Sequence, residues 1–213
     1  FRSMQLKPFH FLPDWPLLRR IAALGLPGSL DMGARGLSSV VVAGIVSRFG
    51  PVAAASYGLV NRLMSVVWTS SGAMEQAVAA GVGQNIGAGN EDRAEKVAWI
   101  GAAVMFVFLT AVATLFFLLA ELMIGIFNVS DEVVATSARF LRLHVFSFGF
   151  WGALDVLQGA FRGAGQTIPP AVLTFAGRWL VQIPLAIAMS YPWGFGADGY
   201  WIALVLPNVL FAL

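Results

Sequence analysis

The sequence predicts an all-α, polytopic membrane protein. Its 213 residues are 58% hydrophobic and only 11% charged, whereas soluble domains carry about 25% charged residues. Long segments without a charge recur along the chain. The clearest of them, at 97–120, has about 24 residues, enough to cross a hydrocarbon core of about 30 Å as a helix. These observations exclude an ordinary soluble fold and favour a six-helix transmembrane bundle.

The six predicted spans are separated by segments rich in Gly, Pro, Asn and Asp. We expect a loop segment at 1–20 and a bundle at 21–213, with spans at about 21–47, 52–87, 94–124, 133–161, 168–191 and 199–213. The sixth span is too short to cross a bilayer, which takes about 20 residues. The chain begins with Phe1 and has no signal-peptide pattern. We therefore expect a fragment of a longer membrane protein with a truncated last helix.

Several other classes of protein are disfavoured. The sequence contains no cysteine, and no Ser-His-Asp or metal-ligand pattern suggests an enzyme. The 13 basic residues are scattered rather than gathered in a stripe, which argues against nucleic-acid binding. The segment GQNIGAGNEDRAEK at 83–96 lacks the Gly-Lys-Ser/Thr ending of a phosphate-binding loop. It is better interpreted as a membrane helix ending in a polar loop.

The distribution of lysines and arginines predicts the orientation. One side carries Arg2, Lys7, Arg19, Arg20, Arg93, Lys96 and Arg162, whereas the other carries Arg48, Arg139 and Arg142. This excess predicts that the N-terminal end lies in the cytoplasm.

Glycines mark the predicted cytoplasmic ends of the second and fourth spans. Gly83 and Gly87 are spaced for close helix packing, and Gly89 follows in the loop. A similar segment, GAFRGAGQ at 159–166, contains Gly163 and Gly165. Its match to GQNIGAGN at 83–90 indicates either an internal repeat of the kind found in transporters or a chance similarity.

Four segments together resemble the C-terminal half of the multidrug and toxic compound extrusion (MATE) transporters. They are LGLPGSL at 24–30, FGPVAAASYGLVNRL at 49–63, GQNIGAGNEDRA at 83–94 and DVLQGAFRGAGQTIPP at 155–170. The resemblance implies a twelve-helix protein of two six-helix bundles in the cell inner membrane. It implies export of cationic or amphipathic compounds by alternating access, in antiport with Na⁺ or H⁺. The N-terminal six-helix half would be the partner of this chain, and no cofactor beyond the coupling ion is implied.

Six ionisable residues lie within the predicted spans, where each costs at least about 2.5–3.5 kcal/mol near a helix centre and therefore suggests a site. They are Asp31, Arg35, Arg62, Glu75, Asp155 and Arg178. Asp155 is the strongest candidate for cation or substrate binding, because Trp151 lies one turn earlier and can offer a cation–π contact. The resemblance adds that NorM-like members have a cation-coupling acid at this position, which makes Na⁺ binding at Asp155 possible. The alternative is a structural ion pair with Arg178 or Arg62.

The other two acids are further candidates for the site. Asp31 and Arg35 are spaced for an intrahelical ion pair, although Asp31 can also face a cavity. The NorM-like acid falls one turn later, where this chain has Arg35, and this departure puts a copy of that sodium site in doubt. Glu75 lies near mid-membrane, and its neighbours Gln76 and Ser71 could share ion coordination or hold the carboxyl group protonated. We expect the three arginines to bridge acids as supporting ion pairs or to extend toward an interface.

Aromatic residues near the span ends are expected at the membrane interfaces. They are Trp15, Trp99, Trp193 and Trp201, and His144 is expected there as well.

Two alternatives to drug export remain. A lipid-linked oligosaccharide flippase of the same superfamily would direct arginines, rather than acids, into the cavity to hold a pyrophosphate. A non-transporting membrane module is the other. The two transport functions differ in which in-span charges face the cavity. Arginines facing the cavity, with the acids buried between helices, would favour the flippase.

Overall fold

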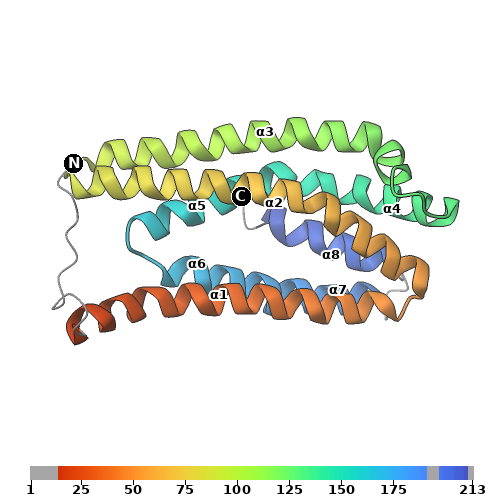
Figure 1. Ribbon diagram of the computed structural model, residues 1–213, viewed down its shortest axis with the longest axis horizontal. Coiled ribbons are helices and arrows are strands. Elements are labelled where there is room, and N and C mark those ends of the chain that lie inside the picture. The colour runs from red at the N-terminus through yellow and green to blue at the C-terminus, as the bar shows by residue number, and fades with distance from the viewer. Residues whose placement is uncertain (1–13, 191–196, 211–213) are drawn as a thin grey trace, which may run out of the picture.

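The computed structural model describes residues 14–190 and 197–210, and nearly all of them are helical (Figure 1). The helices are α1 (Trp15–Ser47), α2 (Pro51–Gly87), α3 (Glu91–Gly125), α4 (Asp131–His144), α5 (Phe148–Gly163), α6 (Ile168–Phe175), α7 (Ile183–Ser190) and α8 (Ala197–Leu210). A 3₁₀ turn, η2 (Val145–Ser147), joins α4 to α5, and a π-helix, η3 (Ala176–Gln182), joins α6 to α7. No strand occurs among these residues, so the all-α prediction is confirmed.

The helices run back and forth along the long axis of the molecule, as expected for a protein that crosses a membrane several times (Figure 1). Within the described part of the chain, four helical stretches are long and apolar enough to do so: Trp15–Ser47, Glu91–Gly125, Asp131–Gly163 and Ile168–Ser190. The helix α2 is as long but more polar, and α8 is shorter. Many large apolar side chains point outward, including Leu118 at 69% and Leu122 at 66% exposure. A lipid environment would cover them.

The first helix begins before the predicted start of the first span. Asp14 caps α1 by accepting a hydrogen bond from the backbone N–H of Leu17 at 3.1 Å, and Pro16 occupies the first turn, where a missing N–H costs nothing. Residues 15–20 are therefore helical, although they fall in the predicted loop segment. Residues 1–13 and 211–213 lie outside the described part of the chain.

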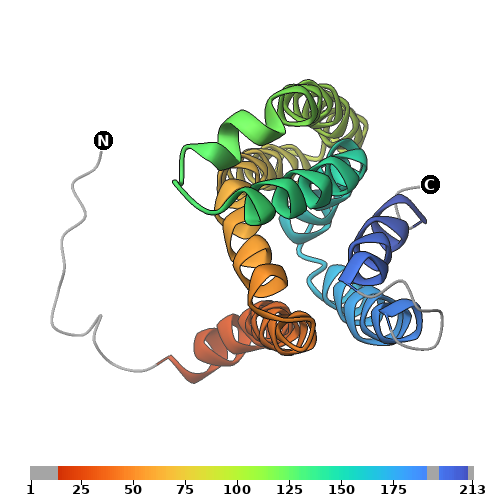
Figure 2. The ribbon, with the colours of Figure 1, turned by 90° about the vertical axis from the view of Figure 1, so that its right-hand side faces the viewer.

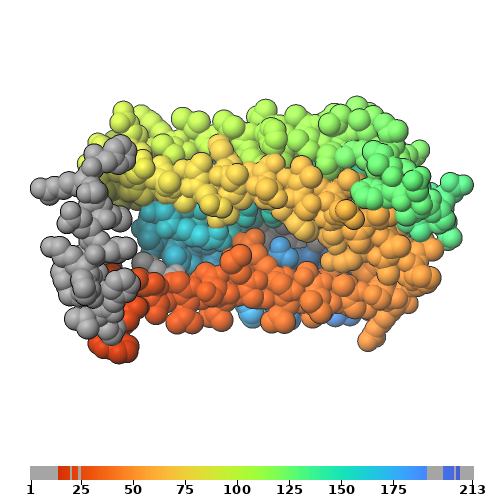
Figure 3. Space-filling view, viewed as in Figure 1, coloured from red at the N-terminus to blue at the C-terminus, as the bar shows by residue number. Residues whose placement is uncertain are grey.

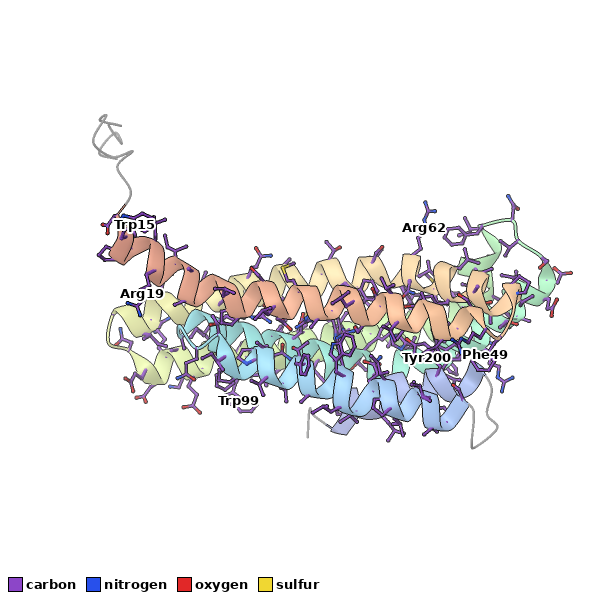
Figure 4. All side chains as sticks on the ribbon, turned by 90° about the horizontal axis from the view of Figure 1, so that it is seen from below. Trp15, Arg19, Phe49, Arg62, Trp99 and Tyr200 are labelled. Atoms are coloured by element: carbon purple, nitrogen blue, oxygen red, sulfur yellow. The ribbon has the colours of Figure 1, made fainter. Side chains whose placement is uncertain are left out.

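Two of the predicted interface tryptophans are exposed toward the same end of the bundle. Trp15 is 74% and Trp99 is 60% exposed, and Figure 4 shows both away from the centre. Trp201 contradicts the prediction, because it is buried and stacks on Tyr57 with ring centroids 5.9 Å apart. Trp193 lies outside the described residues.

The closest helix packing joins α2, α3 and α5 (Figure 2). A side chain on Gly163 would collide with the backbone of Ala79, and one on Gly159 would meet the backbone oxygen of Glu75 at 2.7 Å. Gly83 faces the same contact, because its Cβ position lies 3.1 Å from the carbonyl oxygen of Gly163. Gly87 does not take part, since nothing lies within 4 Å of its Cβ position. The predicted packing role of Gly87 is therefore wrong in this bundle.

The two similar glycine-rich segments form the same turn. Gly89 and Gly165 have left-handed φ angles of +74° and +79°, which favour glycine. The backbone N–H of Asn90 donates to the carbonyl of Asn85, and that of Gln166 donates to Phe161, both at 2.9 Å. This pattern ends a helix with a glycine in the left-handed region. The segments 83–90 and 159–166 are thus similar in backbone structure as well as in sequence.

Candidate functional site

A cavity of about 500 Å³ lies inside the bundle. Its wall combines three charged residues, Arg35, Asp155 and Arg178, with other polar, aromatic and aliphatic side chains from α1, α2, α4, η2, α5, α6, η3 and α8. Figure 3 shows the surface hollowed between α1 and α2, with deeper elements visible between them. A volume of this size suits a drug-sized ligand.

Asp155 lines this cavity from α5 and is only 6% exposed. Its Oδ2 accepts a hydrogen bond from the Ser71 hydroxyl of α2 at 2.8 Å. Its Oδ1 lies 3.7 Å from Nη1 of Arg35. Trp151 also lines the cavity, one turn before Asp155 on α5. The carboxylate that the sequence singles out is therefore buried, oriented from two sides and in contact with an open volume.

Arg35 is a bridge rather than half of a simple intrahelical pair. Its Nε donates to Asp31 at 3.2 Å, as the spacing of four residues predicts. Its Nη2 also donates to Gln158 of α5 and Thr174 of α6, each at 3.2 Å. One guanidinium thus connects three helices. It also lies beside the Asp155 carboxylate.

Arg162 belongs to the same network, although its place after the fourth predicted span makes it part of the predicted cytoplasmic charge excess. Its guanidinium donates to Asp31 at 3.1 Å and is ion-paired with Glu75. Ser71, expected beside Glu75, binds Asp155 instead. Neither Asp31 nor Glu75 is among the residues that line the cavity. A signal for Arg162 was available, because it follows Asp155 by two helical turns and so shares its face.

Arg178 reaches the cavity from the π-helix η3. Its Nη1 donates to the Ser38 hydroxyl at 3.3 Å. Pro184 follows this segment and cannot donate a backbone hydrogen bond, which accounts for a widened helix just before it. π-Helical segments are frequent at functional sites. Arg178 forms no ion pair with Asp155 within the described residues, so that alternative prediction is wrong.

Two further predictions are corrected by the structure. Arg62 is exposed and lies over the Phe127 ring, 5.7 Å from its centroid, and Figure 4 shows it projecting from the bundle. It therefore supports none of the three in-span acids. His144 lines the cavity, and its buried Nδ1 has no hydrogen-bond partner among the residues that the structure describes. The rotation of each helix about its own axis determines whether Arg62 and His144 face the cavity or the outside, and residue spacing alone does not reveal that rotation.

Ion pairs connect the three in-span acids, Asp31, Glu75 and Asp155, with Arg35 and Arg162. Arg178 lies beside this network and is joined to it through the Ser38 hydroxyl. Buried charges are tolerated when they are paired and hydrogen-bonded. Of these residues, Arg35, Asp155 and Arg178 line the cavity. Bundles of this kind, with ionisable groups around an internal cavity, are typical of transporters.

Comparison with known proteins identifies the class more closely. The fold and site are those of a polytopic helical membrane transporter half. The MatE family model matches residues 32–188, and the chain belongs to this family of MATE transporters.

Relatives of known sequence and structure agree. The chain is 28% identical to a probable multidrug resistance protein NorM of Brucella suis, over 96% of this chain and 44% of that protein. It superposes on a MATE crystal structure in the bent conformation with a TM-score of 0.89 and 19% identity, covering 98% of this chain and 46% of the other. A MOP superfamily transporter from Pyrococcus furiosus matches with a TM-score of 0.84 and 19% identity, over 91% and 42% of the two chains. The chain spans less than half the length of the relatives it matches.

Proposed function

We propose that the complete protein is a secondary active transporter that exports cationic or amphipathic compounds in antiport with Na⁺ or H⁺ by alternating access. The observation that carries the proposal is the buried Asp155 carboxylate on the wall of a drug-sized cavity. A carboxylate inside a membrane protein is expensive unless it is used or fully paired. The similarity to proteins named for multidrug resistance supports the same function.

The proposed coupling is a competition at Asp155. A coupling cation or a proton binds the carboxylate, which weakens its attraction to Arg35. Arg35 then shifts its remaining contacts with Asp31, Gln158 and Thr174, and these belong to three different helices. A change at one carboxylate therefore alters how α1, α5 and α6 are held together. Such differential contacts are what a conformational transition requires.

The remaining parts of the proposal concern the whole protein. The N-terminal six-helix half would close the second side of the transport pathway, and the cell inner membrane would be the location, with residues 1–20 on the cytoplasmic side. No cofactor other than the coupling ion enters this scheme, and no enzymatic step is proposed.

The test is efflux of a fluorescent organic cation from proteoliposomes that contain the complete protein, with Na⁺ and H⁺ gradients imposed separately. Gradient-driven efflux supports the antiporter, and the more effective gradient identifies the coupling ion. Absence of efflux under either gradient, from protein shown to be folded, contradicts it.

A flippase for lipid-linked oligosaccharides is the second candidate, and the direction of the charges favours it. Arg35 and Arg178 line the cavity, whereas Asp31 and Glu75 do not. The similar transporter from Pyrococcus furiosus is described as having a binding pocket of reverse polarity that suggests a different function. Asp155 on the cavity wall keeps the antiporter as the first choice. A non-transporting membrane module has no specific observation in its favour.

A further inference from the structure

The two arginines on the cavity wall differ in what neutralises them. Arg35 is held by Asp31 at 3.2 Å and lies 3.7 Å from Asp155. Arg178 has no carboxylate within 4 Å among the described residues, and its guanidinium donates a hydrogen bond to the neutral Ser38 hydroxyl at 3.3 Å. Ser38 in turn donates to the backbone carbonyl of Arg35 at 2.8 Å, which fixes it in place. Arg178 is therefore a positioned cation without a direct counter-charge.

An arrangement of this kind is costly unless an anion completes it. A guanidinium has five N–H donors in a planar fork, and here a single protein acceptor takes one of them. A cation removed from water without a partner is penalised by desolvation. The fork matches a carboxylate or phosphate, which can accept two parallel hydrogen bonds. Arg178 lines the cavity, so an anionic group of a ligand bound there can reach its guanidinium.

The surroundings of Arg178 suit a ligand with an apolar body. Tyr57, Trp68 and Tyr200 contribute aromatic surface to the same cavity. Gln182, one turn beyond Arg178, lines it as well and is only 9% exposed, and its side-chain amide makes no hydrogen bond within the described structure. Its amide can therefore serve a ligand. Apolar walls with a few convergent polar groups are the usual form of a small-molecule site.

We infer that the cavity binds amphipathic compounds through a carboxylate or phosphate group, with Arg178 as the residue that recognises the anion. The inference rests on the proposed function, because it takes the cavity as the substrate site, and it narrows the substrate class. An amphipathic compound that also carries a cationic group satisfies Arg178 and Asp155 together.

Binding of matched fluorescent probes to the complete purified protein tests the inference. The probes share a dansyl body on an alkyl chain and end in a carboxylate, a phosphate ester or a trimethylammonium group. Arg178→Gln is expected to weaken binding of the carboxylate and phosphate probes by about 10- to 100-fold, the range for hydrogen bonds to charged groups. The trimethylammonium probe should keep its affinity. Arg178→Lys, which retains the charge without the fork, should give intermediate affinities.

Arg62→Gln is the matched control, because it removes an arginine that lies over Phe127, away from the acids of the site. It should leave the affinities of all three probes unchanged. Equal weakening of all three probes by Arg178→Gln would overturn the inference, as would failure of both anionic probes to bind the parent protein. Circular dichroism and size-exclusion chromatography check that each variant is folded.

Two sources of the anionic group are separated by competition. Displacement of the carboxylate probe by dioctanoyl phosphatidic acid identifies a lipid headgroup as a ligand, whereas displacement by the soluble amphipath dodecyl phosphate alone identifies a free compound. Both results support the anion site. The probe assay needs no ion gradient, so the two proposals can fail separately. If the anionic probes bind but no gradient drives efflux, only the proposed antiport is contradicted. If gradients drive cation efflux that does not depend on Arg178, and the anionic probes do not bind, only this inference is contradicted.

Discussion

The side of the bundle formed by α2, α3 and α5 is held together differently from the side formed by α1, α6 and η3. On the first side glycines bring backbones into contact, as at Gly159 and Gly163. A cavity separates the helices of the second side from α2 and α5, and charged side chains such as Arg35 and Asp155 meet across it. Close backbone packing fixes one geometry, because a packed interior resists small changes. Ion pairs with alternative partners allow more than one arrangement, so the second side is the better candidate for movement.

Arg162 connects the two sides, and its removal should have the largest effect on stability. Arg162→Ala leaves Asp31 and Glu75 without this partner. Loss of one member of a buried pair costs about 3–5 kcal/mol, and the lower end applies because the Arg162 side chain is 27% exposed. Thermal melting of the purified protein measures the change.

Arg142→Ala is the matched control for that variant. The Arg142–Glu121 pair is exposed, at 38% and 65% for the two side chains, so its loss should cost about 0–1 kcal/mol. Equal losses of stability for Arg142→Ala and Arg162→Ala would mean that the buried ion pairs of Arg162 stabilise the protein no more than an exposed pair does. Adding Glu75→Gln to Arg162→Ala should recover part of the stability, because it removes one of the unpaired charges.

The glycine contact is the next test, on the tightly packed side. Gly163→Val should destabilise the protein by about 1–3 kcal/mol, because its side chain would collide with the backbone of Ala79. Gly87→Val, also near a helix end but with open space around it, should cost less than Gly163→Val. Melting temperatures that fall equally for both variants would contradict the role assigned to close packing.

Ser71 offers the smallest expected effect and sharpens the account of Asp155. Ser71→Ala removes the hydroxyl that donates to Asp155 and should cost about 1 kcal/mol. Ser70→Ala is the control, since that hydroxyl donates to the backbone of its own helix and faces outward. It should change stability by less than about 0.5 kcal/mol. A larger melting shift for Ser70→Ala than for Ser71→Ala would contradict the assigned hydrogen bond.

The sequence predicts the helical membrane fold because composition and length dominate that outcome. It also identifies Asp155 and the pairing of Asp31 with Arg35, since the cost of intramembrane charge and the spacing of four residues are local properties. It does not predict the partners of Arg162, the isolation of Arg62 or the burial of Trp201. These depend on how each helix is rotated against its neighbours. Loop-based charge counting assigns Arg162 to a loop, although its long side chain folds back toward Glu75.

The central claim is that Asp155 couples ion binding to transport through the cavity. Its most direct test is gradient-driven efflux of a fluorescent organic cation by Asp155→Asn in the complete protein, reconstituted in proteoliposomes beside Glu121→Gln, which neutralises an exposed acid. The account predicts that Asp155→Asn inserts and folds normally but loses coupled efflux, whereas Glu121→Gln keeps it. Unchanged efflux by Asp155→Asn would contradict the claim.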